Sequence, residues 1–454
     1  MNNRYQNLKV QYPFIYTLLR WAIIMIPVAI GIGSIIALFL TLLNAAIQYR
    51  FQHPWLLYFL PLAGLLIYLI YRYYGQPAEK GNHLIIEQIQ LEGAAVPKRM
   101  APIILLTTVI THLFGGSAGR EGTAVQIGGS IASLFGRWLK LTGIDRRMVL
   151  TAGVAAGFGA VFGTPFAGAI FAIEFLTSRK IKIDTFLPAL FAAVIGDLTV
   201  SFWQVAHVHY RIDTVVTAPT FIATYFTFDF LLLFKVMLAS IAFGLASFLF
   251  ARMVLEIKLL FNRLFALKWL IPIFGGLLII ALTVLIGKPD YLSLGVAAEY
   301  PGAVTISSAF KQGGADSWSW LWKTIYTAVT LGTGFKGGEV TPLFYIGATL
   351  GNTLAILLNA PVSLFAALGF IAVFAGATNT PLACTTMGVE LFGPQYIVLF
   401  ALACFTAYLF SGYTGIYNTR RMPARLFAGT LKSNTYLQRK FTKYLQPFKK
   451  TKRL

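Results

Sequence analysis

Two charged residues, Arg120 and Glu121, stand in an apolar and glycine-rich part of the chain. The stretch 115–128 reads Gly-Gly-Ser-Ala-Gly-Arg-Glu-Gly-Thr-Ala-Val-Gln-Ile-Gly, with apolar residues before and after it. A charge at membrane depth costs about 2.5 kcal/mol or more, and such charges usually face a cavity or an ion path. Glycines permit close backbone approach, which suits a broken helix whose free N–H groups point at an anion. The stretch therefore predicts an ion pathway.

The composition indicates a polytopic membrane protein. The 454 residues are 57% hydrophobic and 12% charged, with a mean hydropathy of +0.71, whereas a soluble domain has about 25% charged residues. A bilayer is spanned by about 20 apolar residues. We expect spanning helices near residues 21–47, 55–72, 228–250, 269–287, 318–334 and 394–411. Shorter, glycine-interrupted pieces within 101–175 and 338–392 predict half-helices and re-entrant segments.

The net charge of +21 is concentrated at the C-terminus, where residues 420–454 carry eleven Lys or Arg and no acid. The positive-inside rule predicts that this tail is cytoplasmic, together with the N-terminus (Arg4, Lys9) and the segment 179–182. A tail that binds nucleic acid is the alternative, but no aromatic-interleaved groove or known motif accompanies the charge. We therefore expect the lipid bilayer as a partner and no nucleic acid.

The cysteines and histidines predict no metal site and no cofactor. Cys384 and Cys404 both lie in apolar surroundings, which favours neither a disulfide framework nor a thiolate site. His207 and His209 form a His-x-His pair, but no third ligand is evident nearby. The pattern favours a solvated loop over a metal pair.

Two stretches of the chain repeat each other. Gly163–Glu174 matches Asn379–Glu390, and in both a glutamate follows the proline of a Thr-Pro pair by nine residues. Glu121–Gly128 can be laid over Val340–Gly347, an offset of 219 (340 minus 121) against 216 (381 minus 165) for the first pair. Such near-equal offsets predict an internal duplication, as in transporters built from inverted repeats. Coincidence among small and apolar residues is the alternative.

The duplication suggests a division of the chain. We expect a cytoplasmic N-terminal segment (1–20), a first membrane repeat (21–204), a linker (205–230), a second membrane repeat (231–420) and a basic cytoplasmic tail (421–454). Glu174 and Glu390 end the repeated motifs and are predicted to make helix-end contacts at the aqueous boundary, not to bind the transported ion.

The motifs resemble those of a known family. Gly119-Arg120-Glu121-Gly122-Thr123, followed by the Pro-x-Ala-Gly-x-x-Phe pattern within Gly153–Glu174, resembles the CLC chloride-channel and transporter family, whose Gly-Arg-Glu-Gly-Pro motif carries a gating glutamate. Three departures resemble the fluoride/proton antiporter branch, CLC-F. The first is Gly81-Asn82-His83-Leu84-Ile85, which lacks the chloride-binding serine. The second is Gly334–Pro342, and the third is the pair of segments Gly376–Cys384 and Thr414–Tyr417. The match covers about residues 80–420.

The resemblance implies an all-α polytopic membrane protein with a CLC-type fold of two inverted-topology repeats with broken and re-entrant helices. It also implies a homodimer with one pathway per subunit that exports fluoride in exchange for protons and is not an enzyme. Phe175 stands where chloride/proton exchangers of the family place an internal glutamate. The protons must then take another route, for which the branch motif offers Glu339. Ile85 and Tyr345 depart from the commonest branch pattern, which leaves a role for paired aromatics in gating unsupported.

Fluoride is small and strongly hydrated, so a site that removes its water must replace the lost hydrogen bonds with its own. Asn82, Thr341 and Tyr417 can donate from an amide, a hydroxyl and a phenol. Backbone N–H groups at the helix starts of Gly122–Thr123 and Val340 would add donors. The gating and proton-coupling residues are predicted to be Glu121 and Glu339. Residues expected to line the pathway with less direct roles are Gly81, His83, Ile85, Arg120 and Tyr345.

Each assignment has a structural alternative. Asn82 and Thr341 could cap helices, Tyr417 could be an interfacial aromatic residue, and Glu339 could merely neutralise Lys336. A structural pair of Arg120 and Glu121 is disfavoured, since adjacent residues of a helix do not face each other.

Three other functions remain to be weighed. A chloride or general anion channel or transporter of the same fold is the nearest alternative, because Asn82 and Phe175 argue against chloride/proton exchange but not against passive conduction. An intramembrane serine hydrolase is remote: Gly115–Gly119 satisfies Gly-x-Ser-x-Gly, and His112 is the nearest base to Ser117. No phosphate-binding loop supports ATP-driven transport. The absence of a regulatory domain favours a multi-pass protein of a bacterial cell membrane.

Overall fold

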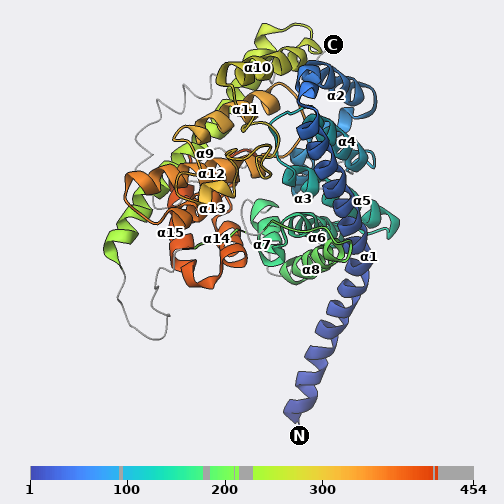
Figure 1. Ribbon diagram of the computed structural model, residues 1–454. Coiled ribbons are helices and arrows are strands. Elements are labelled where there is room, and N and C mark those ends of the chain that lie inside the picture. Colours follow the sequence, from blue (N-terminus) through green and yellow to red (C-terminus); the bar gives the residue numbers. More distant parts are fainter. Residues whose placement is uncertain are drawn as a thin grey trace, which may run out of the picture. The chain divides into compact units, whose positions relative to one another are not determined.

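A computed structural model of the chain describes residues 2–91, 96–176, 185–208, 210–213, 229–412 and 415–417. By its internal contacts the chain divides into residues 1–419 and 420–454. The basic tail, the segment 179–182, His209 and Thr414 lie outside the described residues. The part of the chain that the structure describes is helical (Figure 1). Its one β-type contact is an isolated bridge between Gly119 and Gly338.

The helices differ widely in length, from a long first helix to short, broken ones (Figure 1). They are α1 (Asn2–Gln52), α2 (Leu60–Tyr74), α3 (Asn82–Leu91), α4 (Met100–Leu113), α5 (Glu121–Trp138), α6 (Gly143–Phe162), α7 (Pro165–Leu176), α8 (Phe186–Phe202), α9 (Phe230–Leu264), α10 (Leu270–Ile286), α11 (Ser319–Gly332), α12 (Val340–Leu357), α13 (Val362–Thr378), α14 (Pro381–Phe392) and α15 (Ile397–Phe410), with short 3-10 turns η1 (Pro54–Phe59), η2 (Gln76–Lys80), η4 (Ser308–Phe310) and η5 (Pro394–Tyr396).

The predicted internal duplication is confirmed by matching helices. α4 and α11 have 14 residues each, and α5 and α12 have 18 each; both pairs start 219 positions apart (319 minus 100, 340 minus 121). α7 and α14 have 12 residues each and start 216 positions apart (381 minus 165). The two offsets are those of the repeated motifs, so the repeats fold alike.

Glu174 and Glu390 link the repeats in a reciprocal way. Glu174, near the end of α7, accepts hydrogen bonds from the backbone N–H groups of Leu382 and Ala383 at 3.2 and 2.9 Å. Glu390, near the end of α14, accepts the equivalent bonds from Phe166 and Ala167 at 2.9 and 2.7 Å. Each carboxylate thus caps the start of the other helix, where the helix dipole favours negative charge. This is the helix-end contact expected from the sequence.

Four helical segments are long and apolar enough to cross a membrane, by length and composition: Arg20–Gln52, Pro54–Tyr74, Phe230–Leu264 and Val340–Leu357. The expected spans 269–287, 318–334 and 394–411 do form helices, but shorter ones, as α10, α11 and the segment Pro394–Phe410. α12, expected among the half-helices, has 18 residues and is 78% buried in its apolar window. Its Gly347 lies against the backbone of Gly369 in α13, and such small residues allow close helix packing.

A fully buried lysine is hydrogen-bonded to the segment between α10 and α11. Lys323 on α11 donates from Nζ to the carbonyl oxygens of Tyr291, Leu292 and Ser293 at 3.1, 3.4 and 2.8 Å. The same ammonium lies 5.2 Å from the centre of the Tyr345 ring on α12. The lysine therefore satisfies a turn of backbone carbonyls that would otherwise be buried without donors.

Replacing Lys323 by methionine is expected to lower the stability of the folded protein. Hydrogen bonds from a charged donor contribute about 1.5–3 kcal/mol each, and buried carbonyls left without a donor add to the loss. The thermal midpoint in detergent, followed by fluorescence-detected size exclusion, should fall by several degrees. Lys288→Met is the control, because Lys288 is exposed and pairs with Asp316, a contact worth about 0–1 kcal/mol. Equal midpoints for the two variants would contradict this role of Lys323.

Candidate functional site

The two repeats meet at a crossing of two backbone segments. Gly119 and Gly338 exchange both backbone hydrogen bonds, each at 2.6 Å, and they stand 219 positions apart (338 minus 119) like the repeats themselves. Two residues after each glycine a helix begins, α5 at Glu121 and α12 at Val340. A side chain on Gly122 would lie 3.0 Å from the Cα atom of Gly338, so only glycine permits this approach. The positive ends of two helices thus converge between the repeats.

The carboxylate of Glu121 occupies the start of α12. Its Oε2 atom accepts a hydrogen bond from the backbone N–H of Thr341 at 3.0 Å. The Thr341 hydroxyl lies 2.6 Å from Oε1 and 2.7 Å from Oε2 and donates to one of them at a time. Arg120 adds its backbone N–H at 3.1 Å and its Nε atom at 3.6 Å. Only 1% of Glu121 is exposed, so the carboxylate is held as a helix N-terminus would hold a bound anion.

Gly119 makes room for this carboxylate. A Cβ atom at position 119 would lie 2.9 Å from Oε2 of Glu121, 2.9 Å from Cδ of Pro342 and 3.0 Å from the nitrogen of Thr341. Gly119→Ala is therefore expected to displace the Glu121 carboxylate from α12 and to slow anion transport about tenfold, as loss of about 1.4 kcal/mol would. The test is the initial rate of anion efflux from liposomes.

Gly136→Ala is the matched control for this variant. It places the same methyl group on α5, where the nearest neighbouring atom, Cγ of Arg146, is 3.9 Å away. A wild-type rate in Gly119→Ala, or an equal loss in both variants, would contradict the steric role of Gly119.

Two further predicted residues are Asn82 and Tyr417. Asn82 begins α3, and its Nδ2 atom is 3.5 Å from the Cβ position of Gly122. Among the described residues its buried Oδ1 atom has no hydrogen-bond partner. Tyr417 is buried and packs edge-on against Phe175, with ring centres 4.7 Å apart. The Asn82 amide thus lies beside the start of α5.

Glu339 precedes α12 as its N-cap residue, next to Val340, which is buried at the first helical position. Among the described residues the Glu339 side chain has no hydrogen bond and no ion pair. Lys336 instead places its ammonium 4.3 Å from the centre of the Tyr71 ring. The described part of the chain therefore shows no neutralisation of Lys336 by Glu339.

The remaining predicted residues contact other groups. Thr123 shares a hydrogen bond of 2.8 Å with Thr108 of α4, and Ile85 packs against Gly129 of α5. Gly81 has the positive φ of +55° that turns the chain into α3, and the His83 side chain that follows is exposed. Tyr345 donates from its hydroxyl to the carbonyl of Val304 at 3.3 Å. The structure does not bring these side chains to the Glu121 carboxylate.

The Gly-x-Ser-x-Gly stretch has no hydrolase arrangement. The Ser117 hydroxyl is bonded to Thr327 at 2.9 Å. The two ring nitrogens of His112 contact the carbonyl oxygens of Thr108 and Ala118 at 2.8 and 3.0 Å. His112 therefore contacts the backbone before Arg120 and does not activate the serine.

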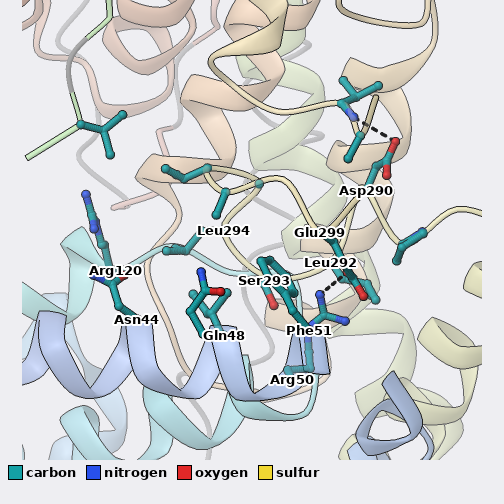
Figure 2. A pocket seen from close by; sticks show the side chains of 18 of the residues that line it. Asn44, Gln48, Arg50, Phe51, Arg120, Asp290, Leu292, Ser293, Leu294 and Glu299 are labelled. Carbon is teal, nitrogen blue, oxygen red and sulfur yellow. Dashed lines mark hydrogen bonds and ion pairs between the residues drawn. The ribbon is translucent and has the colours of Figure 1, made fainter. Parts of the chain in front are cut away.

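Two cavities approach Glu121. The larger, of about 300 Å³, lies between the end of α1 and the segment before α11; we call it the large cavity. Figure 2 shows Asn44, Gln48 and Arg50 of α1 reaching toward it, with Arg50 bonded to Glu299 at 2.5 Å. The second, the small cavity, has a volume of about 20 Å³ and is lined by Glu121 and Thr341. Arg120, Val208 and Val296 line both, so the large cavity leads toward the carboxylate.

His207 also lines the small cavity, a position that the sequence did not indicate. Its Nε2 atom lies 3.2 Å from Oδ1 of Asp197 on α8. The sequence pattern indicated a solvated loop, and a His-Asp contact between residues ten positions apart leaves no periodic pattern in the sequence.

The crossing of Gly119 and Gly338 could have been inferred from the common offset of the repeats.

Comparisons with known proteins agree with this architecture. Residues 63–412 match the family model described as voltage gated chloride channel. A "Chloride/fluoride channel protein" of Pseudomonas syringae pv. tomato is 44% identical over 403 residues, covering 89% of this chain and 86% of that protein. A "Putative chloride channel protein ClcB-like" of Ralstonia nicotianae is 26% identical over 388 residues, covering 80% and 83%.

Solved structures give the same picture. The crystal structure of a CLC-type fluoride/proton antiporter superposes with a TM-score of 0.81 at 32% identity, covering 90% of this chain and 99% of that one. A slow cyanobacterial Cl⁻/H⁺ antiporter superposes with a TM-score of 0.74 at 20% identity, covering 91% and 99%; at that identity the likeness concerns the fold alone.

Proposed function

The chain belongs to the voltage gated chloride channel family, the CLC family that its motifs resemble, and we propose that it is an antiporter that exports fluoride in exchange for protons. The observation that carries the proposal is the Glu121 carboxylate at the start of α12, bonded to the backbone and hydroxyl of Thr341. A carboxylate that occupies an anion position can leave it only for another anion or on taking up a proton. This exchange couples the two fluxes.

The coupling follows from what each form of Glu121 can do. Ionised, the carboxylate accepts the hydrogen bonds of α12 and Thr341 and excludes the anion from them. Protonated, it loses most of its attraction to these donors and to the helix dipole, so that an anion replaces it. Fluoride is the halide basic enough to accept a hydrogen bond from a carboxylic acid, and this property ties its passage to the proton.

Selection of fluoride requires donors that replace its water. Thr341 supplies a hydroxyl and a backbone N–H in the place now held by Glu121. Asn82 near Gly122 and Tyr417 beside Phe175 supply further donors toward the other side of the crossing. We assign proton transfer beyond Glu121 to Glu339, because Phe175 carries no proton and the Glu339 carboxylate is unengaged among the described residues. Gly122, Thr123 and Val340 contribute backbone N–H groups at the helix starts.

The proposal includes an orientation and an assembly. The basic residues at both ends of the chain favour cytoplasmic termini in a cell membrane, for which a bacterial one is the expectation. Because α1 then begins inside and ends at Gln52 near the large cavity, that cavity faces the outside. A homodimer with one pathway per subunit is the assembly that the family resemblance implies.

The test is transport by the purified protein in liposomes loaded with fluoride or, separately, with chloride. Anion efflux is recorded with ion-selective electrodes together with the external pH. Fluoride efflux with proton uptake and little chloride movement is the expected result. Equal chloride efflux, or fluoride efflux without protons, would instead identify a general anion pathway of the same fold.

A further inference from the structure

His207 and Asp197 form a paired acid and base at the edge of the small cavity. His207 is largely buried, with 15% of its side chain exposed, and Asp197 has 22%. The Nε2 atom of the imidazole contacts Asp197, and its Cδ2 atom lies 2.8 Å from the Cβ position of Gly163. The Nε2 atom is therefore engaged, and among the described residues Nδ1 has no hydrogen bond.

The small cavity joins this imidazole to Glu121. Both side chains line it, and its volume of about 20 Å³ holds one water, which needs on the order of 10–15 Å³. The large cavity reaches the same place, since Arg120 and Val208 line both cavities. One water in the small cavity would therefore bridge the imidazole and the Glu121 carboxylate, both of which line it.

We propose that His207, oriented by Asp197, relays protons between the outer solution and Glu121. The imidazole, of whose side chain 15% is exposed, takes a proton from outer water and gives one to the bridging water. That water passes one of its own protons to the Glu121 carboxylate, which becomes neutral, and His207 returns to its uncharged form. Histidine suits this task because its charge changes near neutral pH. The inference rests on the proposed antiport.

The charges around His207 fit such a relay. Asp197 orients the ring through Nε2. Arg120 and Tyr210 also line the small cavity, and Arg120 is paired with Glu121 at 3.6 Å. Glu390 is bonded to the amides at the start of α7. The exposed Arg211 and Asp213 follow in the same segment.

The test compares coupled fluoride and proton flux in liposomes across outer pH values of about 5 to 8. His207→Gln keeps a side chain that can bond to Asp197 but cannot relay a proton. We expect it to slow both fluxes about tenfold or more near pH 8. Near pH 5 the rate should approach that of the wild type, because abundant hydronium protonates Glu121 directly. His53→Gln, on an exposed histidine that contacts the carbonyl of Tyr49, is the control and should keep the wild-type profile.

Chemical rescue separates a relay from a structural contact. His207→Ala should be slow near pH 8 and should regain at least part of its rate when imidazole is added outside. A wild-type profile in His207→Gln would overturn the inference. So would a loss that is equal at every pH and that imidazole does not restore in His207→Ala. If the wild-type protein moves fluoride without protons, the proposed antiport itself has failed, and the variants are not needed to show it.

Discussion

Replacing Glu121 by glutamine is expected to abolish proton transport. The amide has the size of the carboxylate and can still accept the hydrogen bond from the Thr341 backbone, so the fold of the crossing should persist. It cannot take up or release a proton in the range of physiological pH, and it carries no charge to compete with the anion. Proton uptake should fall to the rate of empty liposomes, and any fluoride that still moves should do so without protons.

A control for this variant is offered by Glu256. Its carboxylate lies on the exposed face of α9 and pairs with Arg252 at 2.9 Å, so Glu256→Gln should transport both ions like the wild type. Proton uptake that persists in Glu121→Gln would remove Glu121 from the coupling mechanism. The small cavity and the contacts at the start of α12 would then need another explanation.

Replacing Thr341 by valine is expected to have the second largest effect. Valine has the shape of threonine but lacks the hydroxyl that lies 2.6 and 2.7 Å from the carboxylate oxygens of Glu121. Hydrogen bonds to a charged group contribute about 1.5–3 kcal/mol, which corresponds to about ten- to 150-fold in an equilibrium constant. Fluoride efflux should slow within that range, since fluoride is expected to use the same donor.

Thr341→Ser is the matched variant, because serine keeps the hydroxyl and loses only a methyl group. Its fluoride efflux should stay within a few-fold of the wild type. Equal rates for Thr341→Val and the wild type would mean that the bond between the hydroxyl and Glu121 does not contribute to fluoride transport. An equal loss in the valine and serine variants would point to packing at this buried position and not to the hydrogen bond.

Much of the architecture could be predicted because it repeats. The offsets of 219 and 216 in the motifs became matching pairs of helices, and glycines around Arg120 and Glu121 marked the place where the repeats cross. The expected spans at 269–287, 318–334 and 394–411 exceed their helices by one to three residues at an end, because composition does not mark where the helical hydrogen bonds stop. The chain boundaries proposed from the sequence stay predictions.

Contacts across the fold could not be predicted in the same way. The bond between Glu121 and Thr341 joins residues 220 positions apart, and no local pattern specifies it. Tyr345 lies beside Lys323 because a segment before α11 turns its carbonyls inward, a detail of loop geometry. His207 reads as part of a polar linker, and only the folded chain shows that it lines the small cavity together with Glu121.

The most direct test of the account is uphill transport of fluoride by a proton gradient alone. Liposomes containing the purified protein are prepared with equal fluoride inside and outside, and the outer solution is then made acidic while the membrane potential is clamped. If Glu121 couples the two fluxes, fluoride leaves the liposomes against its growing gradient while protons move in, and Glu121→Gln abolishes both movements. Fluoride that stays at equilibrium in the wild type, despite an intact protein and a maintained pH gradient, would contradict coupled exchange through Glu121.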